Sequence, residues 1–133
     1  MVLLNKKTDE KLKILSILSA IALLSSCQNF FGAKFEIKNN TNHVIDSINI
    51  KSVDHEGNSN YLQLSPGESQ SYWFNMIKIP QVDGSYLLTF RTNPSNIETK
   101  EFGYFTNGSS LEAVTIIQIE SDTVLIEPVY NEY

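Results

Sequence analysis

From Lys34 onward, apolar and polar residues alternate over short runs that are interrupted by clusters of turn-forming residues. Phe35 and Ile37, for example, alternate with Glu36 and Lys38 before a polar cluster follows. An alternation of period two places successive side chains on opposite faces of a strand. Eight such runs predict strands near residues 35–38, 48–51, 62–64, 72–76, 86–91, 102–104, 114–119 and 124–126.

The segments between these runs have the composition of tight turns. Pro66-Gly67 suits a type II turn, and no helical period of useful length occurs after residue 27. About eight short strands with such connections predict an all-β fold, an antiparallel β-sandwich of the immunoglobulin-like or transthyretin-like kind over residues 34–133. Two runs, 71–74 and 115–119, are apolar on both faces, which indicates central strands or a face covered by a neighbour.

The first 27 residues follow a different pattern. Residues 14–24 carry no charge, and as a helix these eleven residues rise only about 17 Å, too short for a bilayer core of about 30 Å. They follow a lysine-bearing segment and precede Ser25-Ser26, a step of small residues that ends at Cys27. This three-part layout is typical of a secretory signal.

The end of this segment, Leu24-Ser25-Ser26-Cys27, resembles the lipobox of bacterial lipoproteins. In that family the cysteine thiol receives a diacylglyceryl group, the chain is cut before the cysteine, and the new amine is acylated. The resemblance implies a signal peptide over residues 1–26, a lipidated Cys27, and a short tether over residues 27–33. An ordinary cleaved signal is the alternative. In enteric bacteria, a residue other than Asp after the lipidated cysteine favours the outer membrane, and Gln28 meets this rule. The resemblance therefore implies a location in the cell envelope, at the outer membrane.

Charge and cysteine content restrict the partners of this chain. From residue 27 onward there are six Lys or Arg and 13 Asp or Glu, and the basic residues are scattered. This balance argues against a nucleic-acid partner, and it repels anionic lipid, so acyl chains would supply the membrane anchor. Because Cys27 is the only cysteine, no intramolecular disulfide can form.

The sequence offers little for catalysis or for binding a metal or cofactor. His43 and His55 lie in polar segments without a second histidine or a cysteine at ligand spacing, so we expect no metal site. Carboxylates act as an acid and base pair only where the fold brings them together, and the candidate pairs are Glu98 with Glu101 and Asp83 with Glu68. We therefore expect a protein that is not an enzyme and holds no cofactor.

Aromatic residues suggest a recognition surface instead. If Tyr72 and Phe74 face the core, Trp73, the only tryptophan, points to the opposite face. Together with Tyr104 or Tyr61, it would form a platform for a sugar ring or a protein partner. The alternative is that Trp73 fills a second packed layer.

These patterns favour a membrane-anchored cell-envelope lipoprotein that acts as a binding or accessory module for a protein or glycan partner. A periplasmic immunity or inhibitor protein against a secreted toxin is an alternative, because an acidic surface suits a basic target. An enzyme that acts on glycan or peptide fits less well. Ser47 and Thr123 lie in Asp-Ser/Thr-aliphatic triplets, which resemble the O-glycosylation site of some Gram-negative lineages.

Overall fold

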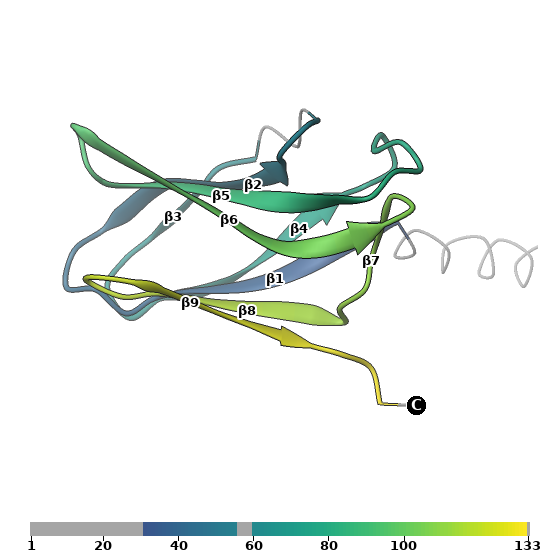
Figure 1. The fold of residues 1–133 in the computed structure, drawn as a ribbon. Coiled ribbons are helices and arrows are strands. Elements are labelled where there is room, and N and C mark those ends of the chain that lie inside the picture. Colours follow the sequence, from purple (N-terminus) through teal and green to yellow (C-terminus); the bar gives the residue numbers. More distant parts are fainter. Residues whose placement is uncertain (1–30, 56–59, 133) are drawn as a thin grey trace, which may run out of the picture. The chain divides into compact units, whose positions relative to one another are not determined.

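The computed structural model describes residues 31–55 and 60–132, and these residues form two facing β-sheets (Figure 1). The predicted signal peptide and Cys27 lie outside the described residues. The strands are β1 (Gly32–Asn39), β2 (Ile45–Ser52), β3 (Leu62–Leu64), β4 (Ser69–Asn75), β5 (Gly84–Asn93), β6 (Asn96–Thr106), β7 (Ser109–Ser110), β8 (Val114–Ile119) and β9 (Val124–Val129). The described part of the chain contains no helix that is long and apolar enough to span a membrane.

The predicted all-β sandwich is confirmed. One sheet has the order β4-β1-β8-β9 and the other the order β3-β2-β5-β6-β7. Neighbouring strands are antiparallel except β1 and β8, which pair in parallel. In an immunoglobulin constant domain, the first, second, fourth and fifth strands share a sheet. Here the first strand lies between the fourth and the eighth, so the order differs from that of an immunoglobulin constant domain.

We call the end where β1 begins the proximal end and the end where β1 finishes the distal end. The composition of the core between the sheets differs between the proximal and the distal end. Its proximal half is aromatic, since the ring of Tyr86 lies 5.1 to 6.1 Å from four others, those of Phe35, Phe74, Phe102 and Phe105. Its distal half is mostly aliphatic and includes Ile37, Ile45, Leu64, Leu88, Ile117 and Ile119. Most inward apolar side chains of both sheets are buried, as the alternation predicts.

Two turns show how local sequence sets the connections. Gly67 has a φ of 77°, and the Glu68 N–H donates to the Ser65 carbonyl at 3.0 Å, as expected for the type II turn at Pro66-Gly67. Asn107 and Gly108 have φ values of 51° and 70°, the two positive values of a type I′ hairpin turn. This second turn joins β6 to β7, a two-residue strand that the alternation does not predict.

Several boundaries differ from the prediction. β1 begins at Gly32, and Ala33 is buried in the core, so the sandwich includes two residues that were expected in the tether. β6 begins at Asn96, six residues before the predicted start, because polar residues occupy its first positions. Gly103, at a φ of 61°, interrupts the alternation in β6 and turns Tyr104 outward beside the buried Phe102.

The two runs that are apolar on both faces take different positions. β8 lies between β1 and β9 and is central, as expected. β4, which contains the run 71–74, is an edge strand whose outward Trp73 is 41% exposed. An apolar residue on both faces therefore did not indicate a central strand here.

Candidate functional site

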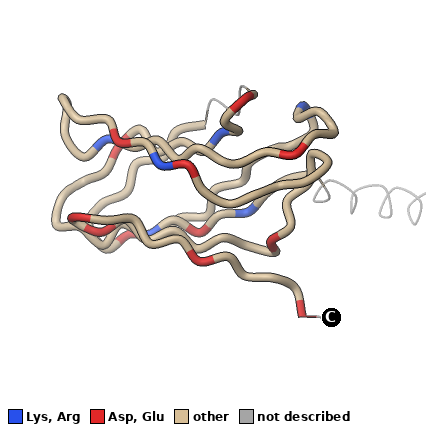
Figure 2. The backbone as a smooth tube through the Cα atoms, in the orientation of Figure 1, with Lys and Arg blue, Asp and Glu red and all other residues tan. Residues whose placement is uncertain are grey.

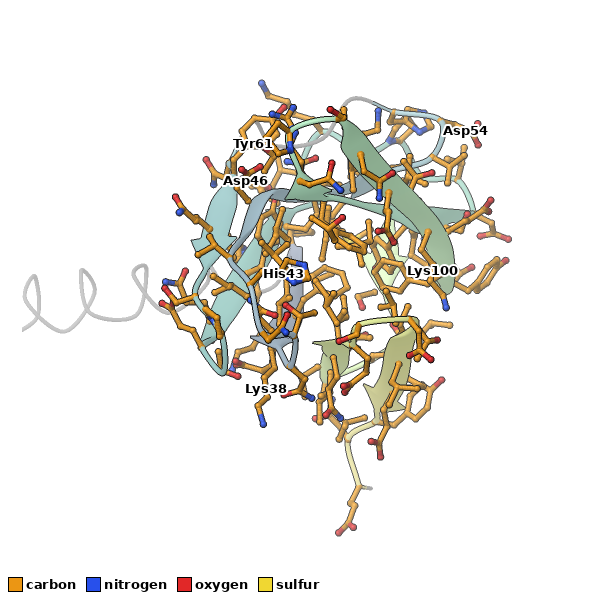
Figure 3. The ribbon with its side chains drawn as sticks, turned by 90° about the vertical axis from the view of Figure 1, so that its left-hand side faces the viewer. Lys38, His43, Asp46, Asp54, Tyr61 and Lys100 are labelled. Carbon is orange, nitrogen blue, oxygen red and sulfur yellow. The ribbon has the colours of Figure 1, made fainter. Side chains whose placement is uncertain are left out.

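A cleft of about 450 Å³ opens at the distal end, between the hairpin that joins β5 to β6 and the hairpin that joins β8 to β9. Figure 3 looks onto this end, with His43 near the middle of the view. The charged lining residues are acidic, and no Lys or Arg lines the cleft. Its lining consists of Thr41, His43, Thr92, Asn93, Asn96, Glu98, Glu120, Ser121, Asp122 and Thr123.

The cleft is polar because the core-facing side of β6 carries charged residues toward the distal end and apolar residues toward the proximal end. Glu98 pairs with Phe90 and Lys100 pairs with Leu88, and both β5 partners point into the core. Glu98 and Lys100 nevertheless remain exposed. The Lys100 ammonium donates to the Val124 carbonyl of β9 at 3.0 Å, so it bridges the two sheets (Figure 3). Beyond this bridge, Glu98 faces the cleft rather than apolar core.

Asn39 fixes the loop that forms one wall of the cleft. Its side chain is fully buried, and its Nδ2 donates to the carbonyls of His43 and Leu64 at 2.8 and 3.0 Å. Its Oδ1 accepts from the backbone N–H and the hydroxyl of Thr41 at 2.9 and 2.7 Å. One buried amide therefore orders the β1–β2 loop, because an unsatisfied buried polar group is costly.

Two further amides position the carboxylates on opposite walls. Asn40 Nδ2 donates to Glu120 Oε1 at 2.7 Å on the β8–β9 side. Asn96 Nδ2 donates to Glu98 Oε1 at 3.1 Å on the β5–β6 side. Figure 2 shows acidic positions on both hairpins that border the cleft. The cleft thus presents fixed carboxylate oxygens from two directions, an arrangement suited to accept hydrogen bonds from a cationic group.

The carboxylate pairs suggested by the sequence are not brought together. Glu98 faces the cleft, whereas Glu101 pairs with the outward Leu87 and accepts a hydrogen bond from the Ser85 hydroxyl. The other pair is separated along the long axis, because Asp83 precedes β5 at the proximal end and Glu68 precedes β4 at the distal end. Among the described residues, no group of three His, Cys, Asp or Glu side chains is placed to hold a metal ion.

The aromatic residues proposed as one platform lie on different faces. Trp73 points outward from the four-stranded sheet, where its indole lies against Gly32 of β1. Tyr104 lies in β6 of the opposite sheet. Because the sheets pack face to face, outward side chains of the two sheets point apart. A single platform of Trp73 with Tyr104 therefore does not form.

Tyr61 lies beside a second hollow, of about 370 Å³, on the outer side of the five-stranded sheet. Arg91 also lines this hollow, and its Nε lies 3.8 Å from Asp46 Oδ1. Figure 3 shows Tyr61 and Asp46 on the same side of the domain. The remaining lining residues are Ser47, Thr89, Phe90 and Ile97.

Tyr104 lies near the proximal end, close to Asp83. Hydrogen bonds to Asp83 from the Thr106 hydroxyl, the Tyr104 hydroxyl and the Asn107 N–H hold the pKa of that carboxyl below its usual range. The Thr106 bond, at 2.6 Å, is the largest of these causes. Tyr104 thus belongs to a structural cluster around the β6–β7 turn.

The two triplet hydroxyls also differ in setting. Ser47 lies at the bulge of β2 with a φ of 53°, and its hydroxyl donates to Asp46 Oδ1 at 2.9 Å. Thr123 is exposed in the β8–β9 turn and lines the distal cleft.

Sequence reasoning missed the distal cleft and the role of Asn39. The cluster Asn39-Asn40-Thr41-Asn42 has the composition of a turn, and nothing in it shows that the first amide is buried. The available signal was Glu98 and Lys100 at alternate positions ahead of Phe102, which places charges on the core side of one strand. No protein-family model matches the chain, and no curated protein matches it either.

Proposed function

We propose that this protein is a lipid-anchored cell-envelope module, without catalytic activity, that binds a partner through the distal cleft. The position of the cleft carries the proposal. The cleft lies at the distal end of the sandwich, whereas the chain enters β1 at the proximal end. Four residues separate Cys27 from Gly32, and they reach about 14 Å when extended. β1 then runs about 25 Å toward the cleft. An anchor at Cys27 leaves the cleft facing away from the bilayer.

The chemistry of the cleft favours a positively charged partner segment. Glu98 and Glu120 are held by Asn96 and Asn40, so their oxygens are oriented before a partner arrives. Asp122 adds a third carboxylate. Lysine or arginine side chains of a protein match this set, because hydrogen bonds between charged groups are stronger than those between neutral groups.

Site-directed photo-crosslinking in cells tests the cleft. A photoreactive residue at Ser121, in the full chain, should give defined adducts with one envelope protein. Glu98→Arg should abolish these adducts by placing a like charge before the basic partner. Glu127→Arg is the matched control, because Glu127 is exposed on the outer side of β9 and should leave the adducts unchanged. Adducts that persist in Glu98→Arg, or are lost equally in both variants, would remove the cleft from the proposal.

The anchor is tested separately. Intact mass spectrometry of the mature protein should show acyl chains on Cys27, and Cys27→Ala should release the protein from the membrane fraction. One acyl chain anchors only marginally while two or more hold firmly, so the difference between the two forms should be large. Equal membrane fractionation of the two forms would exclude lipid anchoring.

The acidic cleft also favours a second candidate, a periplasmic immunity or inhibitor protein. Such a protein would occupy a basic surface of a secreted toxin through the same carboxylates. A toxin gene beside this gene, whose product is neutralised by the parent protein but not by Glu98→Arg, would distinguish this role from that of a general envelope module.

A further inference from the structure

Exposed apolar side chains are concentrated at the proximal end. Among the described residues, thirteen large hydrophobic side chains are exposed, and four of them lie elsewhere: Val44, Tyr61, Ile97 and Leu125. The other nine lie in the connections at the proximal end or within two residues of the proximal terminus of β1, β2, β4, β6 or β9, and they are Phe31, Val53, Trp73, Ile77, Val82, Tyr104, Leu111, Val129 and Tyr130. Their exposed fractions reach 67% at Ile77 and 57% at Phe31.

Backbone hydrogen bonds join several of the proximal connections that carry these side chains. The Met76 N–H donates to the Phe31 carbonyl at 2.9 Å, which joins the β4–β5 connection to the start of β1. The Gly108 N–H donates to the Val82 carbonyl at 2.9 Å and joins the same connection to the β6–β7 turn. In the four-stranded sheet, the Ala113 N–H ahead of β8 donates to the Val129 carbonyl of β9 at 2.8 Å. The apolar side chains are thus displayed by backbone that is already fixed.

Two acidic groups near these side chains accept hydrogen bonds within the domain. Asp83 accepts hydrogen bonds from Thr106 and Asn107, and Glu112 accepts one from the Ser110 hydroxyl at 3.0 Å. Lys78, beside Ile77, is exposed. Tryptophan, tyrosine, aliphatic residues and a lysine are the composition that favours a bilayer–water interface.

We propose that the proximal end rests in the headgroup layer of the bilayer, with Ile77 and Leu111 against lipid and Trp73 at the interface. The inference deepens the proposed function and rests on the lipid anchor at Cys27. The anchor is the reason to expect lipid, rather than another partner, against this surface. Phe31 follows Cys27 by four residues, so it stays within about 14 Å of the lipidated cysteine. An apolar surface held this close to the bilayer gains free energy when it contacts lipid, because the contact removes apolar area from water. Docking would orient the domain and hold the distal cleft outward.

Fluorescence of Trp73 tests the docking directly, because it is the only tryptophan in the chain. The full, lipidated protein is placed in phosphatidylcholine vesicles whose lipids carry bromine on the upper part of the acyl chain. Bromine quenches tryptophan by contact, so the emission of Trp73 should fall to roughly half at the interfacial depth expected for tryptophan. Ile77→Glu and Leu111→Glu, both at exposed positions that should leave folding intact, should restore most of the emission.

Two matched controls define the result. A Trp73→Phe, Val44→Trp protein carries its single tryptophan at the distal end and should show no quenching. Leu125→Glu adds a charge at an exposed apolar position toward the distal end and should leave the quenching of Trp73 unchanged.

The outcomes separate the two proposals. A protein without acyl chains by mass, which does not float with vesicles, would overturn the anchor. An acylated protein that floats, but whose Trp73 is unquenched or is quenched no more than the Val44→Trp reporter, would overturn the docking and leave the anchor standing. A dimer in detergent that Ile77→Glu dissociates, with no quenching in vesicles, would assign the surface to a second copy of the chain and also overturn lipid docking.

Discussion

The two ends of this sandwich are built from the same strands but present opposite chemistry. At the proximal end, an aromatic core around Tyr86 underlies connections that expose apolar side chains. At the distal end, a mostly aliphatic core lies beneath loops that are ordered by the buried amide of Asn39 and open into an acidic cleft.

The difference shows that the two ends of a small sandwich can be stabilised in different ways. Aromatic rings bury the largest apolar areas, so the ring cluster around Tyr86 stabilises the proximal end. A polar cleft cannot be held by packing alone, and its loops need hydrogen bonds that leave no buried group unsatisfied. Each end should therefore respond to a different kind of substitution.

The largest effect is expected at the distal end. Asn39→Ala removes four side-chain hydrogen bonds from a fully buried site and should lower the free energy of unfolding by about 3 kcal/mol. At the proximal end, Asn75 is exposed and accepts one bond from the Ile77 N–H, so Asn75→Ala should cost only about 0.5 kcal/mol. Urea unfolding curves measure both values. Equal losses would show that the loops do not depend on Asn39.

A pH-dependent effect of nearly this size is expected at the proximal core. Burial raises the pKa of Tyr86 to about 12, whereas an unfolded tyrosine titrates near pH 10. The folded state thus keeps the proton longer, and its stability is complete below pH 10 and falls by about 3 kcal/mol as pH rises to about 12. Tyr86→Phe should remove most of this decline in urea unfolding between pH 9 and about 12. An unchanged decline would place its source elsewhere.

A smaller effect is expected where β1 meets Trp73. A Cβ at position 32 would collide with the indole of Trp73, so Gly32→Ala should displace the ring and cost about 1 kcal/mol. The emission maximum of Trp73 should shift to longer wavelength because the ring becomes more exposed. Ser69→Ala, at an exposed position near the distal end of the same strand, serves as the control and should leave the emission unchanged.

The smallest effect concerns the proximal β6–β7 turn. The folded state lowers the pKa of Asp83, chiefly through the Thr106 hydroxyl, so its contribution to stability is present above pH 4 and is lost as pH falls through the lowered pKa. Asp83→Asn should lower the unfolding midpoint slightly at pH 7 and leave it equal to that of the parent at pH 2. A difference that persists at pH 2 would indicate a loss unrelated to the carboxylate charge.

Much of the fold follows from local sequence, because strand alternation and turn chemistry are local properties. Pro66-Gly67 forms the turn that its residues favour, and the alternation from Tyr86 to Phe90 marks an inward row that the structure buries. β6 departs from this rule, since its polar first half gives no local signal for a strand and is held by pairing with β5.

The candidate site could not be predicted from local sequence. Glu98 and Glu120 are 22 positions apart in the sequence, and only the packing of two sheets brings their hairpins to one cleft. The predicted partnership of Trp73 with Tyr104 failed for the same reason, because exposure was foreseeable but the sheet to which each strand belongs was not.

The sequence by itself determined that this chain forms short strands with one buried face, and it supplied the lipobox resemblance that predicts an anchor at Cys27. Only the tertiary structure decided which strands share a sheet, that β1 and β8 run parallel, and that apolar and acidic surfaces lie at opposite ends. Alternation and turns depend on neighbouring residues, whereas sheet order and clefts depend on contacts between residues far apart in the chain, which no local pattern specifies.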